Sequence, residues 1–470
     1  MAVARAPLQV KVIPMAAHGR WLGGILLVGA MTTLRLAHAG TDAGPPPAAS
    51  YVKGPYLQAL SATGVTIKLE ISSAAPARVD LYAAAGTTPI ASTSSDAALT
   101  FHALRVDGLR PATAYDYLVS AGGALGERGH FTTAPDDARP FRFLVYGDSR
   151  SDPLAHAAVV RAMEATPADF LVNTGDMVAS GDADADWLSF FSVEARLLRD
   201  RCVFAAVGNH ELRRGDPTTG GAFLRYFAAL EAGHELTRLY ASFRWSNTRF
   251  FVLNAMDAWT GEERAWLRAE LDRALVEPGL AHRFAVMHWG PYSSGPHGNN
   301  PALASGDVLA LMRDRKVDLV LSGHDHDYER GLGGGLKYLV TGGAGAPLYA
   351  LKTALAESIV FEPAYHFVDV AVSGDRVDVV ARRAAGGIID ACGYVGAGSW
   401  SCAPNSPAAG AASGVGATPA ALAAPAGPVR ARNGSGCGCA IVGAGAASGA
   451  GSAALGVVAA LGALGRRRRR

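Results

Sequence analysis

The chain is poor in cysteine and in net charge. Its 470 residues include five cysteines, too few for disulfides to serve as the main scaffold. The 43 lysines and arginines nearly balance the 41 aspartates and glutamates, and five arginines stand together at positions 466–470. The rest of the chain is therefore near neutral or acidic, which argues against a broad basic surface for nucleic acid. No long internal repeat stands out.

Five short segments each end a hydrophobic run in residues that can bind a metal ion. They are Tyr146-Gly147-Asp148, Thr174-Gly175-Asp176, Gly208-Asn209-His210-Glu211, Val286-Met287-His288 and Ser322-Gly323-His324-Asp325-His326-Asp327-Tyr328-Glu329-Arg330. The runs before them predict buried strands at residues 141–145, 170–172, 203–207, 284–286 and 319–321. Strand ends of an open α/β sheet meet at one edge, so these polar side chains converge.

Asp, Asn and His together offer oxygen and nitrogen ligands, which suit zinc, manganese or iron better than calcium. Two such ions about 4 Å apart can clamp a phosphate and lower the pKa of a bound water molecule. Asp176 is our candidate for the bridging ligand, because a carboxylate has two oxygens to share. A single Asp or His at a strand end more often caps or turns the backbone, but five ordered segments favour a metal site.

The series Gly-Asp, Gly-Asn-His-Glu, His and Gly-His-x-His resembles the calcineurin-like metallophosphoesterases. Three segments are similar to the purple acid phosphatase branch: Gly323–Arg330, His288 with Pro291, Tyr292, Ser293 and His297, and Gly54-Pro55-Tyr56-Leu57-Gln58. The resemblance covers residues 51–385. It implies two divalent or trivalent ions, Fe, Zn or Mn, and a small phosphate ester as substrate.

The resemblance also implies the ligands of each ion. The first ion would be bound by Asp148, Asp176 and His326. The second would be bound by Asp176, Asn209, His288 and His324. His210 would lie beside the phosphate and assist the leaving group, as a general acid or a hydrogen-bond donor. His297 would be a second group facing the phosphate, and a metal-bound hydroxide would attack in line with the leaving alcohol.

Two positions depart from the family pattern. Purple enzymes carry Gly-Asp-x-x-Tyr with the tyrosine on iron, but Ala179 stands there, so we expect no purple colour. The wider family often has Asp-x-His at the first segment, and here that histidine is Arg150, which stays protonated and cannot bind a cation. Arg150 either contacts the substrate phosphate or forms a salt bridge with Asp152 or Glu211. Asp152 or His156 is an alternative source of the missing ligand, although a helix-face role for His156 is favoured.

The two ends of the chain predict export. Residues 1–39 have the pattern of a signal peptide, with basic residues, the apolar run Trp21–Leu34 and Ala37-His38-Ala39 before the expected cleavage. The apolar run is short for the alternative, an uncleaved anchor. Residues 403–436 are a low-complexity linker. Residues 437–470, with Cys437-Gly438-Cys439, a weakly apolar stretch and Arg466–Arg470, resemble myxobacterial sorting signals removed by a protease; a plain transmembrane anchor is the alternative.

Two folded regions are predicted between these ends. Residues 51–134 show alternating strands at 65–70 and 77–82, and Leu109–Tyr117 resembles a strand entry of a fibronectin type III-like sandwich, with a corner tyrosine at Tyr115. Residues 140–385 alternate strands with helices near 154–165, 183–199, 261–276 and 302–315, which predicts an α/β domain. The resemblance implies two packed β-sheets flanked by helices. Closing strands are expected at 338–345 and 366–383.

Four further residues receive structural predictions. Cys392 and Cys402 flank a short loop and can pair in an oxidising compartment, and Cys202 is an inert buried thiol. His366 begins an apolar strand, so a structural role is favoured over ligation.

The predicted protein is an exported metal-dependent phosphomonoesterase, resembling an acid phosphatase and located at the cell surface, in the outer envelope or outside the cell. One alternative is a phosphodiesterase acting on nucleotides or lipid head groups. Another is a surface binding protein with a lapsed metal site. The sequence does not give the oligomeric state.

Overall fold

The computed structural model describes residues 49–212, 220–227, 239–256, 261–304 and 307–402. The predicted signal peptide, the linker and the C-terminal segment lie outside the described residues. Within those ranges, no helix combines the length and the apolar character needed to cross a bilayer.

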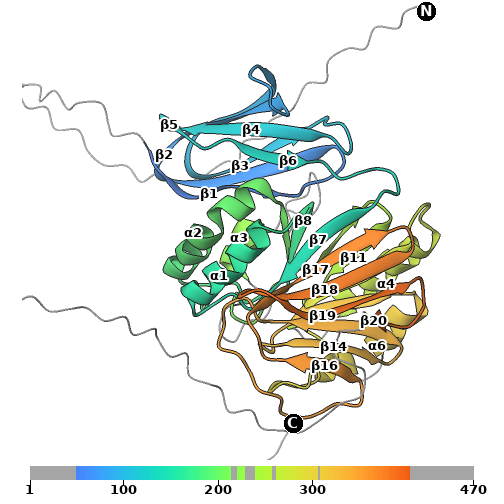
Figure 1. Ribbon diagram of the computed structural model, residues 1–470. Coiled ribbons are helices and arrows are strands. Elements are labelled where there is room, and N and C mark those ends of the chain that lie inside the picture. Colours follow the sequence, from blue (N-terminus) through green and yellow to red (C-terminus); the bar gives the residue numbers. More distant parts are fainter. Residues whose placement is uncertain (1–48, 213–219, 228–238, 257–260, 305–306, 403–470) are drawn as a thin grey trace, which may run out of the picture. The chain divides into compact units, whose positions relative to one another are not determined.

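The first region is an antiparallel sheet of six strands (Figure 1). They are β1 (Tyr51–Gln58), β2 (Gly64–Ala83), β3 (Pro89–Asp107), β4 (Ala114–Ala121), β5 (Ala124–Leu125) and β6 (Gly129–Thr132). The segments predicted as separate strands at 65–70 and 77–82 form one long strand, β2, whose register against β3 shifts between Glu70 and Ala77. The Tyr115 hydroxyl accepts a hydrogen bond from the Arg110 backbone N–H at 3.1 Å. The region is all-β as predicted, while the fibronectin-type assignment stays a prediction.

The second region contains two seven-stranded sheets. The first runs in the order β20-β19-β18-β17-β7-β8-β9 and the second in the order β10-β11-β12-β13-β15-β14-β16. The first sheet comprises β7 (Phe141–Tyr146), β8 (Phe170–Asn173), β9 (Val203–Ala205), β17 (His366–Ser373), β18 (Arg376–Arg383), β19 (Ile388–Val395) and β20 (Ser401–Cys402). The second comprises β10 (Ala241–Trp245), β11 (Thr248–Val252), β12 (His282–Trp289), β13 (Leu319–Gly323), β14 (Tyr328–Gly333), β15 (Leu336–Thr341) and β16 (Ser358–Glu362).

All five strands predicted before the polar segments are present. β7, β8 and β9 are parallel neighbours in the first sheet, and β12 and β13 are parallel neighbours in the second. The closing strands expected at 366–383 are β17 and β18, which form a hairpin that turns at Gly374, where φ is 61°. The first sheet also continues past residue 385 through β19, which pairs with β18.

Alternation along the strands explains why two sheets pack together and helices cover them. Phe143 and Val145 of β7 belong to the core cluster shared by both sheets, whereas Leu144 and Tyr146 belong to the cluster formed with helices. Successive side chains of a strand point to opposite faces, so both faces of β7 are buried. The central cluster is rich in aromatic rings, with Phe170 stacked on Phe143 at 5.2 Å between ring centroids.

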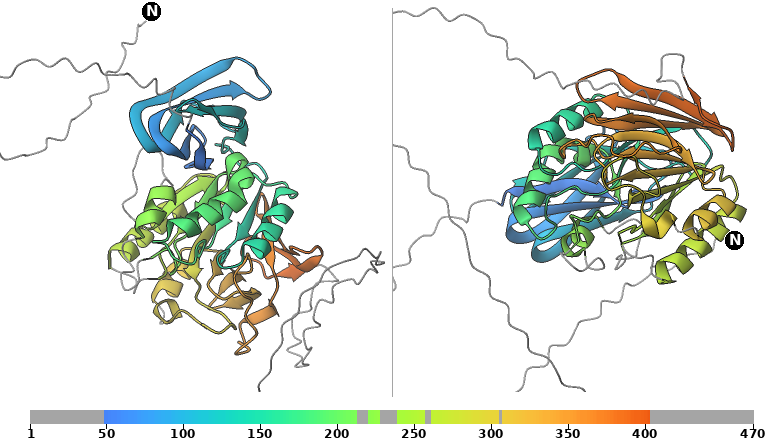
Figure 2. Two further views of the ribbon diagram at one scale, coloured as in Figure 1. Left: turned by 90° about the vertical axis from the view of Figure 1, so that its left-hand side faces the viewer. Right: turned by 90° about the horizontal axis from the view of Figure 1, so that it is seen from below.

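Helices cover the outer faces of these sheets (Figures 1 and 2). The described helices are α1 (Pro153–Glu164), α2 (Asp184–Asp200), α3 (Gly221–Phe227), α4 (Gly261–Val276), α5 (Pro301–Ala304) and α6 (Asp307–Asp314). The first three share a core with β7, β8 and β9, and α4 and α6 share another with β11, β12 and β13. The helices expected near 154–165, 183–199 and 261–276 are confirmed. The segment expected as one helix at 302–315 contains α5 and α6, and α3 was not predicted.

The Gly54–Gln58 segment that resembles the phosphatase branch lies on β1 and contacts the second region. The Gln58 side chain donates to the Val203 backbone carbonyl at 3.1 Å. The Tyr56 hydroxyl donates to the Tyr226 carbonyl at 3.1 Å, and its ring lies 4.9 Å from that of Phe191. These residues are buried, so the segment anchors the first sheet rather than entering the metal centre.

Candidate metal centre

The predicted site residues do converge at the carboxyl ends of parallel strands. Asp148 follows β7, Asp176 follows β8, His288 is the next-to-last residue of β12 and His324 follows β13. Three of these non-glycine residues have a positive φ: 57° at Asp148, 54° at Asp176 and 73° at His324. Such conformations cost free energy and gather at functional sites, where the surrounding structure holds them.

The Nε2 atom of His288 is surrounded by the other predicted ligands of the second metal ion. It is 3.1 Å from Asn209 Oδ1, 3.3 Å from Asp176 Oδ1 and 3.1 Å from His324 Nδ1. His288 Nδ1 lies 2.9 Å from the Thr174 carbonyl and donates to it, so Nε2 is the ring atom that can release its proton and bind a metal ion. The atoms around Nε2 are acceptors, so the site favours a cation among them, either a proton on Nε2 or a metal ion that replaces it. This donor set fits a transition-metal ion.

Charge in the site supports the same conclusion. Burial alone lowers the pKa of His288, but the carboxylates of Asp176 and Asp148 raise it to about 9. Burial raises the pKa of the Asp148 carboxyl well above its ordinary value. Its Oδ2 accepts the His324 backbone N–H at 3.0 Å, whereas its buried Oδ1 has no hydrogen-bond partner. That oxygen lies 4.0 Å from His288 Nε2 and 3.6 Å from His326 Nε2.

The first predicted metal position is different, because Arg150 reaches into it. Its Nε donates to Asp176 Oδ2 at 3.2 Å, and its Nη2 lies 3.3 Å from His326 Nε2. The salt bridge left open by the sequence is therefore made with Asp176, and the partners suggested there were wrong. The Oδ1 atom of Asp152 caps α1 by accepting the N–H groups of Leu154 and Ala155.

The main role that the sequence reasoning did not predict is that of Glu211. One of its carboxylate oxygens accepts the backbone N–H groups of Gly208 at 2.8 Å and Asp176 at 2.9 Å. The other accepts those of Met177 at 2.8 Å and Val178 at 3.2 Å. Burial and the nearby Asp176 carboxylate raise the pKa of Glu211 to about 7. Glu211 thus ties the loop after β9 to the loop that carries Asp176.

Replacing Glu211 by glutamine is expected to weaken metal binding about 10- to 100-fold, the usual cost of losing an outer partner of a ligand. The amide NH₂ would face backbone N–H donors, which also lowers the free energy of unfolding by about 1–3 kcal/mol. Metal titration and chemical denaturation measure the two effects. Glu127→Gln is the matched control, since that side chain is 82% exposed. Unchanged metal affinity in Glu211→Gln would contradict this role.

His210 and His297 both border the site. His210 Nδ1 donates to the Ala179 carbonyl at 2.7 Å, which leaves its half-buried Nε2 free at 3.8 Å from Asp176 Oδ2. Asp325 accepts from the backbone N–H and the Nδ1–H of His297, at 3.0 and 2.8 Å. The His297 ring then lies 4.0 Å from that of His324. Asp325 was also missed, because only the folded loop shows that it orients His297.

Two other histidines have structural roles. His156 Nε2 pairs with the buried Glu194 carboxylate at 2.8 Å, and Tyr146 donates to the same carboxylate at 2.7 Å. His366 is buried and lies 2.8 Å from the Ala364 carbonyl, as the prediction of a structural role requires. Neither residue contacts the metal centre.

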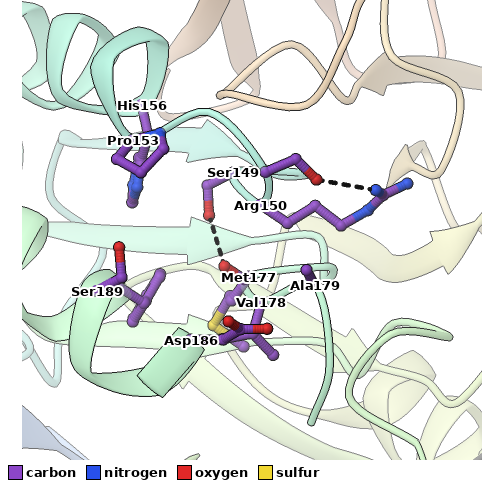
Figure 3. Close-up of a pocket in the computed structure, with 11 residues that line it drawn as sticks. Ser149, Arg150, Pro153, His156, Met177, Val178, Ala179, Asp186 and Ser189 are labelled. Carbon is purple, nitrogen blue, oxygen red and sulfur yellow. Dashed lines mark hydrogen bonds between the residues drawn. The ribbon is translucent and has the colours of Figure 1, made fainter. Parts of the chain in front are cut away.

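A pocket of about 220 Å³ opens beside the first metal position. Figure 3 shows Arg150 and Ala179 on one side of it, with His156 and Ser189 on the other. The pocket thus includes the position where the purple enzymes carry a tyrosine.

The sequence of the segment that carries most of these residues matches a known protein family. Residues 141–328 match the family described as calcineurin-like phosphoesterase. This segment is therefore similar to the calcineurin-like phosphoesterases. The similarity supports a phosphoester hydrolase, as the strand-end motifs predicted.

Curated relatives extend the similarity. An uncharacterised protein of Mycobacterium tuberculosis is 29% identical over 258 residues, which are 47% of this chain and 49% of that protein. Purple acid phosphatase 23 of Arabidopsis thaliana is 27% identical over 272 residues, 49% of this chain and 57% of that protein. The chain therefore spans about half the length of the curated relatives it matches.

Among solved structures, the purple acid phosphatase PPD1 from yellow lupin (Lupinus luteus) seeds has a similar fold, with a TM-score of 0.62. Its sequence identity is 16%, and the match covers 72% of this chain and 74% of that one. At this identity the likeness concerns the fold alone.

Proposed function

We propose that the protein is an exported metal-dependent phosphatase that hydrolyses phosphate monoesters. The observation that carries this proposal is the convergence of Asp176, Asn209 and His324 on His288 Nε2, at 3.1–3.3 Å. The purple acid phosphatase relatives support the choice of monoesters. We assign the ions to Fe, Zn or Mn from the mixed oxygen and nitrogen donors.

A metal ion bound there supplies a Lewis acid for a phosphoryl oxygen and lowers the pKa of a water molecule. The side chains around the site supply the proton and the hydrogen bonds that the reaction needs. A water molecule supplies the oxygen added to phosphorus, and the ester P–O bond breaks. The attacking water releases one proton to solvent. His210 in its protonated form keeps Nδ1–H on the Ala179 carbonyl and gives its Nε2 proton to the departing alcohol oxygen. His297, protonated and held through Nδ1–H by Asp325, donates an Nε2–H hydrogen bond to the phosphate.

Export is proposed from the sequence of residues 1–39 and 437–470. The Cys392–Cys402 disulfide between β19 and β20 supports it, because such bonds persist in oxidising compartments. The fibronectin type III-like identity of residues 51–134 is part of the same proposal, with the hydrogen bond between Tyr115 and Arg110 as its support.

The test is a comparison of two substrates with the purified full-length chain, loaded in turn with Fe, Zn and Mn. We expect p-nitrophenyl phosphate to be hydrolysed with a higher kcat/KM than bis-p-nitrophenyl phosphate, and a chelator to abolish both activities. A preference for the diester would favour the phosphodiesterase instead. No bound metal and no turnover of either ester would point to a lapsed site.

A further inference from the structure

The first metal position already holds a positive charge that belongs to the chain. We propose that the guanidinium of Arg150 takes the place of the first metal ion, so that each chain binds a single metal ion, at the second position. This inference rests on the proposed function and specifies the make-up of the same site. It departs from the pair of ions that the family resemblance implies.

The carboxylate of Asp176 provides the first argument. Its Oδ1 faces the second position, 3.3 Å from His288 Nε2, and also accepts the His210 backbone N–H at 3.0 Å. Its Oδ2 accepts the Nε–H of Arg150 at 3.2 Å. The two oxygens that a bridging ligand would share between two ions are therefore divided between one ion and one guanidinium.

His326 provides the second argument. Its Nδ1 donates to the Pro347 carbonyl at 2.7 Å, so its lone pair is on Nε2. That lone pair faces Arg150 Nη2 at 3.3 Å, and Nη2 is a donor. The Tyr349 ring stacks on the imidazole with centroids 4.0 Å apart, which fixes the ring in this orientation. The atom expected to bind the first ion thus accepts a hydrogen bond from Arg150 instead.

Ligands for an ion beside Arg150 are also in short supply. Ala179 replaces the expected tyrosine, Asp152 caps α1, and His156 is paired with Glu194. Among the described residues, one group of histidines and carboxylates brings three ligand atoms within 4.8 Å of one another, and it is Asp176, His288 and His324 of the second position. The other group found in that part of the chain contains two cysteines already joined in a disulfide.

Electrostatics favours this substitution. An arginine remains charged at any working pH, and its side chain is only 15% exposed here. A divalent ion in the same place would be repelled by the guanidinium at close range. The guanidinium itself offsets the charge of Asp176, and its Nη1 edge, which contacts Ser151, remains available to a phosphate oxygen.

Metal content of the purified full-length chain tests the proposal. We expect one ion per chain in the wild type and in Arg150→Lys, which keeps the charge. We expect two in Arg150→Ala, because the ligands Asp148, Asp176 and His326 become free. Arg376→Ala, an exposed arginine on β18, is the matched control and should keep one ion. In manganese-loaded protein, the electron paramagnetic resonance signal should change from that of an isolated ion in the wild type to that of a coupled pair in Arg150→Ala.

His326→Ala gives an independent measurement if Arg150→Ala does not fold. The proposal expects one ion in His326→Ala, as in the wild type, since His326 holds Arg150 and no metal. Two ions in the wild type, or a single ion in folded Arg150→Ala, would overturn the role of Arg150 while leaving the proposed phosphatase function intact. A wild type that binds no ion under any loading would overturn the proposed function as well.

Discussion

Asp176→Ala is expected to lose its bound metal and more than about 100-fold of its kcat/KM toward p-nitrophenyl phosphate. Loss of an outer partner of a ligand already costs about 10- to 100-fold, and Asp176 faces the metal position directly. Its Oδ1 lies 3.3 Å from His288 Nε2, and its Oδ2 accepts from Arg150 at 3.2 Å. Removing the carboxylate also leaves the part-buried His210 N–H without its acceptor.

Elemental analysis and steady-state kinetics on the same preparation measure these losses. Asp176→Asn keeps the shape and one oxygen, so it should retain more metal than the alanine variant. Asp314→Ala, at a side chain that is 58% exposed, should behave as the wild type. Full metal content with unchanged kcat/KM in folded Asp176→Ala would contradict the assignment of this residue.

The strand-end residues were predictable because hydrophobic pattern and topology alone bring them together. A Val-, Leu- or Phe-rich run forms a buried strand, parallel strands end at one edge, and a polar residue directly after the run must lie there. Asp148 after β7 and Asp176 after β8 follow from that argument without knowledge of any contact. The same reasoning supplied the helices between these strands, whose starts and lengths are visible in the sequence.

The supporting contacts were not predictable, because they depend on how loops turn. The four N–H groups that Glu211 accepts come from two loops after different strands, and nothing in Gly-Asn-His-Glu indicates them. Arg150 has several acids within reach along the sequence, and only the folded site selects Asp176. The end of the domain was missed because β19 follows a Gly-Gly turn at 386–387 and carries no motif.

His210→Ala is expected to lower kcat about 10²- to 10⁴-fold, the usual range for losing a general acid, while leaving the metal content unchanged. The reason is geometric. Nδ1–H of His210 is committed to the Ala179 carbonyl at 2.7 Å, so the proton that the protonated ring can give up is the one on Nε2. Asp176 Oδ2 lies 3.8 Å from that Nε2. The carboxylate attracts the protonated ring, but at this distance it makes no hydrogen bond with Nε2. The histidine side chain makes none of the contacts at His288 Nε2 that define the second metal position.

The decisive measurement is how the loss varies with the leaving group. A nitrophenolate departs readily without a proton, whereas an alkoxide does not, so the His210→Ala loss should be much larger for an alkyl phosphate than for p-nitrophenyl phosphate. His297→Ala serves as the comparison, because a residue that only hydrogen-bonds the phosphate should lower kcat/KM for both substrates by a similar factor. Equal losses for both leaving groups in His210→Ala would mean that this histidine positions the phosphate, and the proton would then reach the alcohol from water.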